Sequence, residues 1–204
     1  MRRTVTFLAL TLLAAPLAAQ NEQPAGWEVR FDRADADASA LTFMSMERGW
    51  HITTGPAGIF YEPQTTGTGQ FAAEATFHLF DPKGRREGFG LFVGGKDLKG
   101  DGQSYLYFLI RNDGRYLVKT RNGSETATLK PWTEHAAIKP FDPSQSSIEN
   151  VLGIAADDAT VTFYINGEKA TSLPRADANV DGIVGLRVNH ALNVHVTDLK
   201  VAKK

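Results

Sequence analysis

From Phe71 to Arg121 the chain alternates apolar and polar residues, and this pattern restricts the possible folds more than any other feature of the sequence. Successive side chains of a strand point to opposite sides of a sheet, so strict alternation is typical of half-buried antiparallel strands. One parity is uniformly apolar and is predicted to form the core: Phe71, Ala73, Ala75, Phe77, Leu79, Phe89, Leu91, Val93, Leu106, Phe108 and Ile110. No segment keeps an apolar period of 3.6 residues over several turns, so we predict an all-β protein.

The opposite parity carries tyrosines, polar side chains and glycines instead of the usual charged coat. Aromatic rings can stack on the apolar faces of sugar rings, and contiguous aromatic surface tends to mark a binding site. We therefore expect these side chains to share one face and to hold a flat polar ligand. The predicted ligand-binding residues are Glu74, His78, Phe92, Gln103, Tyr105, Tyr107, Lys119 and Arg121.

A second interpretation of this face stays open. The pairs Tyr107–Lys119 and Tyr105–Arg121 can also act as cross-strand pairs that stabilise a sheet without touching any ligand. Outside the alternating segment, Trp132 is the aromatic residue to test for binding, although tryptophan more often belongs to a core or a lid.

The first residues have the features of a secretory signal peptide. Arg2 and Arg3 are followed by an apolar stretch at 7–13 and by a segment at 16–19 that ends in the small residues Ala18 and Ala19. That stretch is too short to span about 30 Å of hydrocarbon, and no later segment is apolar enough to do so. We predict that 1–19 is a signal peptide, that 20–204 forms a single β-sandwich domain, and that the protein is secreted or periplasmic.

Composition excludes several classes of function. The chain has no cysteine, which rules out disulfides, thiol chemistry and thiolate metal sites. Its net charge is −1 with both signs mixed throughout, which argues against nucleic acid as a partner. None of the five histidines has an H-x-x-H neighbour, so no metal site is predicted. We expect no cofactor; one alternative is Ca²⁺ at the loop bearing Asp97 and Asp101, where Lys96 and Lys99 oppose a cation.

Short strand signals separated by glycine-rich and Asn/Asp-rich turns continue along the whole mature chain. They predict an antiparallel sandwich of two sheets. The predicted strands are 27–31, 40–46, 49–54, 58–62, 69–80, 87–94, 102–111, 115–121, 124–130, 148–156, 159–165, 168–173, 182–188 and 192–201.

The burial pattern also fixes local register. A two-residue loop at Asp113-Gly114 would put Lys119 opposite Phe108 in the core, whereas a three-residue loop ending in a left-handed Gly114 pairs Phe108 with Val118. We therefore predict the three-residue loop. Asn166-Gly167 predicts a two-residue hairpin, and a change of apolar parity predicts a bulge near Thr197-Asp198.

Several segments resemble motifs of the concanavalin A-like (laminin G-like) jelly-roll superfamily. Val161 to Gly167, reading V-T-F-Y-I-N-G, is similar to the "V-x-V-Y-x-N-G" hairpin of such domains. The other matching segments are Gly49 to Ile52, Gly58 to Tyr61, Gly69 to Ala75, Gly102 to Phe108, Gly182 to Val188 and Val194 to Val201. The resemblance covers nearly the whole mature chain and implies a jelly-roll fold.

Within that superfamily the chain most resembles bacterial secreted domains of the 3-keto-disaccharide hydrolase type, which implies action on oxidised glycosides. No Asn-Ser-Gly segment follows the strand bearing Glu74, and the Glu-x-Asp-x-Glu strand of family 16 glycoside hydrolases is missing. No catalytic residue is therefore carried over. Glu74 is the only acid between residues 70 and 80 and is the one candidate for a catalytic role.

The sequence thus supports three functions in a definite order. The first is an exported module that binds a carbohydrate or glycan on the polar-aromatic face. The alternative is a glycoside-processing hydrolase of the 3-keto-disaccharide hydrolase type, for which glycoside chemistry usually needs two carboxyl groups about 5 to 9 Å apart. The second alternative is a structural or envelope-associated interaction protein.

Overall fold

The computed structural model describes residues 23–203, so the predicted signal peptide at 1–19 lies outside the described residues. All the strands predicted from the sequence are present, and β4 and β9 run several residues longer than predicted. The strands are β1 (Glu28–Phe31), β2 (Thr42–Ser45), β3 (Trp50–Thr53), β4 (Gly58–Gly67), β5 (Phe71–Phe80), β6 (Gly88–Lys96), β7 (Ser104–Arg111), β8 (Arg115–Asn122), β9 (Glu125–Glu134), β10 (Ser147–Ala156), β11 (Thr160–Ile165), β12 (Glu168–Pro174), β13 (Gly182–Val188) and β14 (Asn193–Lys203). Two short 3₁₀ helices, η1 (Ala38–Ala40) and η2 (Arg175–Asp177), complete the regular structure of this part of the chain.

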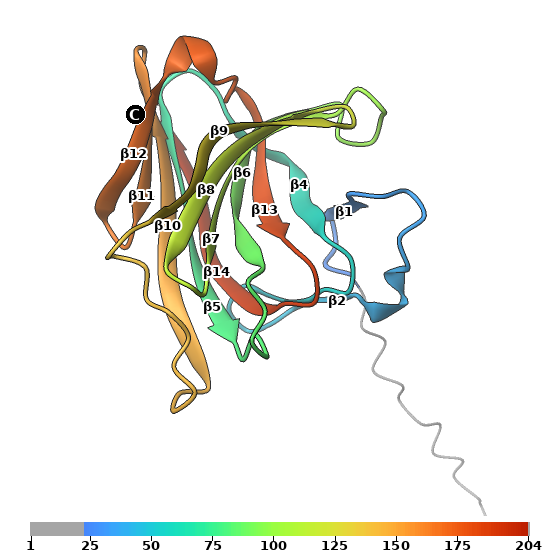
Figure 1. The fold of residues 1–204 in the computed structure, drawn as a ribbon. Coiled ribbons are helices and arrows are strands. Elements are labelled where there is room, and N and C mark those ends of the chain that lie inside the picture. Colours follow the sequence, from blue (N-terminus) through green and yellow to red (C-terminus); the bar gives the residue numbers. More distant parts are fainter. Residues whose placement is uncertain (1–22, 204) are drawn as a thin grey trace, which may run out of the picture.

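The strands form two antiparallel sheets of seven strands each, in the jelly-roll arrangement predicted from the sequence. Sheet A has the order β1-β4-β13-β6-β7-β8-β9, and sheet B has the order β12-β11-β10-β5-β14-β3-β2. Figure 1 shows the sheets packed as two layers, with the β8–β9 hairpin sweeping across sheet A.

The three predictions of local register are confirmed. In the β7–β8 hairpin Phe108 pairs with Val118 and Tyr107 with Lys119, and Gly114 has a φ of 79°. Asn166 and Gly167 both have positive φ at the tip of the β11–β12 hairpin. In β14 the pairing with β5 shifts between Thr197 and Lys200, at the predicted bulge. The alternation therefore predicted correctly which side of its own sheet each side chain takes.

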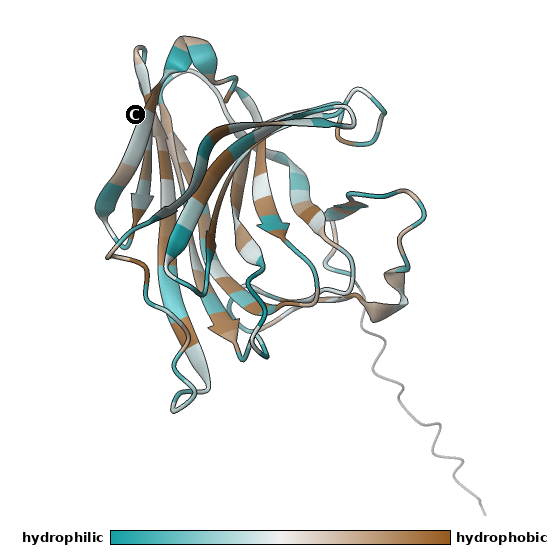
Figure 2. Cartoon of the chain, in the orientation of Figure 1, coloured by the Kyte–Doolittle hydropathy of each residue, from teal (hydrophilic) through white to brown (hydrophobic). Residues whose placement is uncertain are grey.

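Side chains of one parity from both sheets form the main core. Phe77, Phe108 and Phe163 are fully buried within it, together with aliphatic residues from almost every strand. Along the strands in Figure 2, hydrophobic and hydrophilic bands alternate as the sequence pattern requires. Each Å² of apolar surface that the two sheets bury contributes about 25 cal/mol of stabilisation. A core of this kind can therefore stabilise a chain that has no disulfides.

A second apolar cluster lies on the outer face of sheet A, away from the main core. Its members belong to the opposite parity of the same strands or to the loop after β6: Ile59, Tyr61, Phe92, Leu98, Tyr105, Tyr107, Leu109 and Leu117, with Trp132 and Ile183 packed against them. We call this group the outer cluster. Its side chains are nearly all buried, so the outer face of sheet A is covered rather than open.

No helix between residues 23 and 203 is long and apolar enough to cross a membrane.

Candidate functional site

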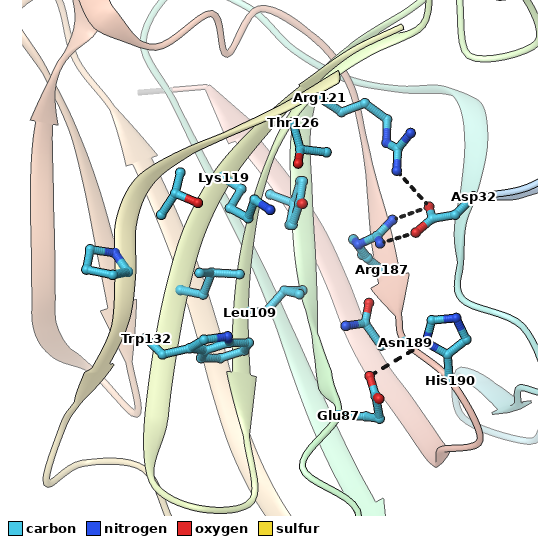
Figure 3. A pocket seen from close by; sticks show the side chains of 14 residues that line it. Asp32, Glu87, Leu109, Lys119, Arg121, Thr126, Trp132, Arg187, Asn189 and His190 are labelled. Atoms are coloured by element: carbon cyan, nitrogen blue, oxygen red, sulfur yellow. Dashed lines mark hydrogen bonds and ion pairs between the residues drawn. The ribbon is translucent and has the colours of Figure 1, made fainter. Parts of the chain in front are cut away.

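The outer face of sheet A carries a cavity of about 580 Å³ beside the outer cluster (Figure 3). That volume lies within the range usual for small-ligand sites. We call it the sheet A cavity. It is lined by Asp32, Glu87, Tyr107, Leu109, Leu117, Lys119, Arg121, Thr126, Thr128, Pro131, Trp132, Arg187, Asn189 and His190.

One wall of the cavity is the β8–β9 hairpin. The pairing of these strands shifts between Tyr116 and Val118 and again between Val118 and Lys119. Bulges of this kind bend a strand and increase its twist. These bulges account for the curvature of the hairpin. Because the hairpin curves, Lys119 and Trp132 both point into the cavity, as Figure 3 shows.

Trp132 is the aromatic residue of this wall. Its indole is half-buried, and the guanidinium of Arg111 lies over its ring at 4.3 Å from the centroid. Arg111 is itself fixed by Asp113, whose Oδ1 accepts a hydrogen bond from Nε at 2.6 Å. Because Arg111 covers one side of the indole, the part of the ring that lines the cavity is held in a defined orientation.

The opposite wall is organised by an ion pair between Asp32 and Arg187. Arg187 projects from β13 and donates to both carboxylate oxygens of Asp32, at 2.8 and 2.6 Å. Asp32 follows β1 directly, and its backbone N–H donates to the carbonyl oxygen of Ala57 at 3.0 Å. Arg121 adds a longer contact to Asp32 at 3.5 Å. Two arginines from different strands therefore converge on one carboxylate.

Arg187 also ties this ion pair to the tyrosines beneath it. Its Nη1 donates to the hydroxyl of Tyr105 at 3.2 Å, and its guanidinium lies 4.7 Å from the centroid of the Tyr107 ring. The side chain of Arg187 is only 6% exposed, so its charge depends on Asp32 for compensation.

These contacts set the protonation states of the site. Burial alone would raise the pKa of Asp32, but the hydrogen bond and charge of Arg187, with Arg121, outweigh it and hold the pKa below 3.8. Burial would lower the pKa of Arg187, and its hydrogen bond to Asp32 reverses the direction. Burial raises the pKa of Tyr105 and of Tyr107. At neutral pH the site therefore presents an ionised Asp32, a charged Arg187 and neutral phenols.

A second, more exposed pair closes the lower end of the cavity in Figure 3. Nδ1 of His190 lies 3.7 Å from Oε2 of Glu87. The backbone N–H of Asn189 donates to the carbonyl oxygen of Gly88 at 2.9 Å, which joins the end of β13 to the start of β6. The side-chain oxygen of Asn189 is buried without a hydrogen-bond partner among the described residues.

Three of the eight predicted binding residues line the sheet A cavity: Tyr107, Lys119 and Arg121. Tyr105 lies beneath it, bound to Arg187. Their side chains point to the outer side of sheet A as predicted, but the tyrosine rings are not exposed platforms. Tyr105 is 3% and Tyr107 is 4% exposed, because the outer cluster and Arg187 cover them.

The predicted stacking of a sugar on Phe92 is wrong, because that ring is fully buried in the outer cluster. Gln103 is 5% exposed and does not line the cavity, and its backbone carbonyl oxygen accepts a hydrogen bond from the backbone N–H of Gly123 at 2.7 Å. Leu98, in the loop after β6, packs into the same cluster. The alternation could not predict this covering segment.

Glu74 and His78 do not share a face with the tyrosines, and that expectation is also wrong. Both lie on β5 in sheet B, where Glu74 pairs with Gly153 and Lys200 and His78 with Glu149 and His195. Local alternation shows which side of its own sheet a residue takes, but not which sheet a strand joins. A ligand role for either residue would have to be exercised at a separate surface of sheet B.

In the loop after β6, the carboxylate of Asp97 accepts a hydrogen bond from within the loop itself. The backbone N–H of Gly102 donates to Oδ2 of Asp97 at 3.1 Å, so this carboxylate closes its own turn. The described residues contain no group of three or more His, Asp or Glu side chains arranged to hold a metal ion. The calcium alternative at Asp97 and Asp101 stays a prediction.

Sequence reasoning missed Asp32, Arg187, Asn189 and His190. Arg187 did leave a signal, since it is the single charged residue in the otherwise apolar strand G-I-V-G-L-R-V at 182–188. Asp32 left none, because it begins a run of polar loop residues with several acids. The two are 155 positions apart, so nothing local joins them.

Comparison with solved structures shows what this fold is similar to. A carbohydrate-binding module, CBM66, from Bacillus subtilis superposes with a TM-score of 0.63 at 12% identity, over 87% of this chain and 96% of that one. Sheep galectin-11 in complex with glycerol gives a TM-score of 0.51 at 12% identity, over 78% of this chain and all of the other. A family 16 glycoside hydrolase from the mixed-linkage glucan locus of Bacteroides ovatus gives 0.57 at 10% identity, over 86% and 94%.

Similarity at this level of identity establishes the jelly-roll fold and nothing finer. No family model matches the chain, and no curated protein matches it in sequence. The resemblance to 3-keto-disaccharide hydrolases therefore stays a prediction.

Proposed function

We propose that this protein is an exported glycan-binding module and that the sheet A cavity is its binding site. The observation that carries the proposal is the half-buried indole of Trp132, oriented by Arg111, beside a cavity lined by fixed charges and hydroxyl groups. A sugar needs both an apolar platform for its ring and hydrogen-bond partners for its edge. The similarity in fold to a carbohydrate-binding module and a galectin supports the proposal.

The polar groups match a polyhydroxylated ligand. Asp32 stays ionised because its pKa is lowered, and a carboxylate has more acceptor positions than Arg187 and Arg121 occupy. Thr126 and Thr128 add exposed hydroxyls from β9. The ion pair is already formed, so binding orders few additional side chains and costs little conformational entropy.

The test is a glycan array followed by affinity electrophoresis on the glycans that bind. Trp132→Ala is expected to weaken binding about tenfold, which corresponds to the loss of one stacking contact of roughly 1.4 kcal/mol. Tyr164→Ala is the matched control, because Tyr164 is a half-buried aromatic on β11 in sheet B. Binding that survives Trp132→Ala but not Tyr164→Ala would place the site on sheet B and contradict the proposal.

A hydrolase is the second candidate, because two carboxylates, Asp32 and Glu87, line the same cavity. Asp32, with its lowered pKa and two hydrogen bonds from Arg187, is unsuited to donate a proton, so that role would fall to Glu87. Turnover of a 3-keto-glucoside by the wild type, abolished in Glu87→Gln, would replace the binding module by the enzyme. No glycan binding and no turnover would leave a structural or envelope-associated role.

A further inference from the structure

We propose that the sheet A cavity selects glycans that carry carboxylate groups, and that Lys119 is the partner of the carboxylate. This inference rests on the proposed function and names its ligand class as acidic polysaccharides built from uronic acids. It follows from how the charges around the cavity are paired.

Both acids of the cavity already have side-chain partners. Asp32 is held by Arg187 and contacted by Arg121, and Glu87 lies beside His190. The side-chain ammonium of Lys119 has no hydrogen bond or ion pair with any other residue in the described part of the chain. Three lysine and arginine side chains thus face two carboxylates, and one positive charge is left uncompensated. The chain as a whole carries −1, so this excess is local to the cavity.

Arg121 is only partly satisfied and lies next to Lys119 on the same side of β8. Its contacts to Gly123 and Asp32 are long, at 3.4 and 3.5 Å, and its buried Nε has no hydrogen-bond partner among the described residues. Positions 119 and 121 are separated by about 7 Å along the strand. The two residues therefore follow one another along β8, and in Figure 3 Lys119 points into the cavity while the guanidinium of Arg121 turns towards Asp32.

Each of these cations has a threonine directly opposite on β9. Lys119 pairs with Thr128, and Arg121 pairs with Thr126. An ammonium beside a hydroxyl supplies two donors for a carboxylate, and a charge-assisted hydrogen bond is about twice as strong as a neutral one. A neutral hexose would use the hydroxyls but would leave the ammonium without an anion.

The spacing suits a sugar that rests on Trp132. Tyr116 pairs with Thr133 and Val118 with Lys130, so Trp132 lies across from Leu117, one outward position before Lys119. A pyranose ring over the indole therefore has Lys119 about 7 Å further along β8, where an exocyclic carboxylate of that ring or of its neighbour would lie. Both Lys119 and Trp132 point into the cavity in Figure 3.

The experiment compares uronic acid oligosaccharides with their carboxyl-reduced forms, which keep the linkage and remove the charge. The probes are oligogalacturonate, oligoalginate and a glucuronate-containing tetrasaccharide, each titrated by calorimetry in low and physiological salt. The wild type is expected to bind at least one acidic probe about tenfold more tightly than its reduced form. That preference is expected to shrink as salt rises, because salt screens exposed charges.

Lys119→Met is expected to remove most of the preference and to change binding of the reduced probe less than about twofold. Lys119→Arg is expected to restore part of it, and Lys169→Met, an exposed lysine on β12, is the control that should change neither. Equal binding of the acidic and reduced probes, or an equal loss for both in Lys119→Met, would overturn the inference while leaving glycan binding intact. Failure of every acidic, reduced and neutral glycan to bind would instead overturn the proposed function.

Discussion

The strands of both sheets alternate in the same way, but the side chains on their outer faces differ in solvent exposure. On sheet A the outward residues Tyr105, Tyr107 and Arg187 are no more than 5% exposed. On β5 of sheet B the outward residue Glu74 is exposed and His78 is half-buried. An outward side chain is therefore not the same as an accessible one, and the difference lies in what covers each sheet.

A loop covers part of the outer face of sheet A, and contacts to β1 hold this loop in place. The loop after β6 inserts Leu98 into the outer cluster, and two contacts to β1 hold it there: Arg30 donates to the carbonyl oxygen of Leu98 at 2.9 Å, and Lys99 pairs with Glu28 at 2.7 Å. On sheet B three histidines from adjacent strands stand side by side, with His195 at 6.2 Å from His51 and 5.9 Å from His78 between ring centroids. One face has become a second core beside the sheet A cavity, whereas the other keeps these half-buried histidines, two of which line a hollow of about 420 Å³.

The largest expected effect follows from removing the charge that the covered face depends on. Asp32→Ala leaves the buried charge of Arg187 without a carboxylate partner and is expected to destabilise the fold by about 3 kcal/mol, at the lower end for a buried pair because Asp32 keeps some exposure. Urea unfolding monitored by tryptophan fluorescence would measure it as a shift in midpoint at constant slope.

The control for this prediction is an ion pair of similar geometry on the open surface. Asp35 pairs with Arg33 at 2.7 Å, and both side chains are mostly exposed. Asp35→Ala is expected to leave the unfolding midpoint unchanged, since exposed pairs contribute little. Equal shifts for Asp32→Ala and Asp35→Ala would show that the ion pair under the sheet A cavity is not buried in solution.

A smaller effect is expected from packing, and a glycine in each sheet makes the comparison. A Cβ at Gly185 in β13 would lie 2.5 Å from the carbonyl oxygen of Phe60 and 2.6 Å from the ring of Phe92. A Cβ at Gly153 in β10 would meet its nearest atom at 3.5 Å, which is ordinary contact. Gly185→Ala is expected to cost about 1–3 kcal/mol by overpacking. Gly153→Ala is expected to be neutral or stabilising by about 0.5 kcal/mol.

Thermal unfolding of the two variants would measure this difference. The packing of the outer cluster would be looser than described if Gly185→Ala melted at the same temperature as the wild type.

The comparison also marks the limit of what the sequence could predict. The strands, the β7–β8 register and the bulge in β14 followed from parity and turn chemistry, which are local. Sheet membership did not, because β5 pairs with β10 and β14, both distant in sequence, and this separates Glu74 from Tyr105. The sheet A cavity combines both kinds of information. Lys119 and Arg121 were predictable from the hairpin, whereas Asp32 and Arg187 meet only in the finished fold.

The smallest expected effect is a difference in the pH range over which each face loses its contribution to stability. Burial lowers the pKa of His51 and of His195 below 6.5, and at His195 the charges of His78 and His51 act in the same direction. Below pH 6.5 the unfolded chain therefore binds protons that the folded chain takes up only at lower pH. Stability contributed by the sheet B histidines falls as the pH drops from 6.5 towards their lowered folded values, and then stays level.

Asp32 affects stability in a different pH range, because its pKa in the folded protein is lowered from 3.8. Its contribution is complete above pH 3.8 and is lost as the pH falls further, through the folded value. Unfolding free energies measured in urea across both windows should show two separate declines. The double variant His51→Gln/His195→Gln is expected to flatten the first decline and keep the second, and Asp32→Asn is expected to do the reverse from a lower starting stability. A double variant that retains the whole decline below pH 6.5 would assign it to other groups, and the two faces would then not differ in their response to acid.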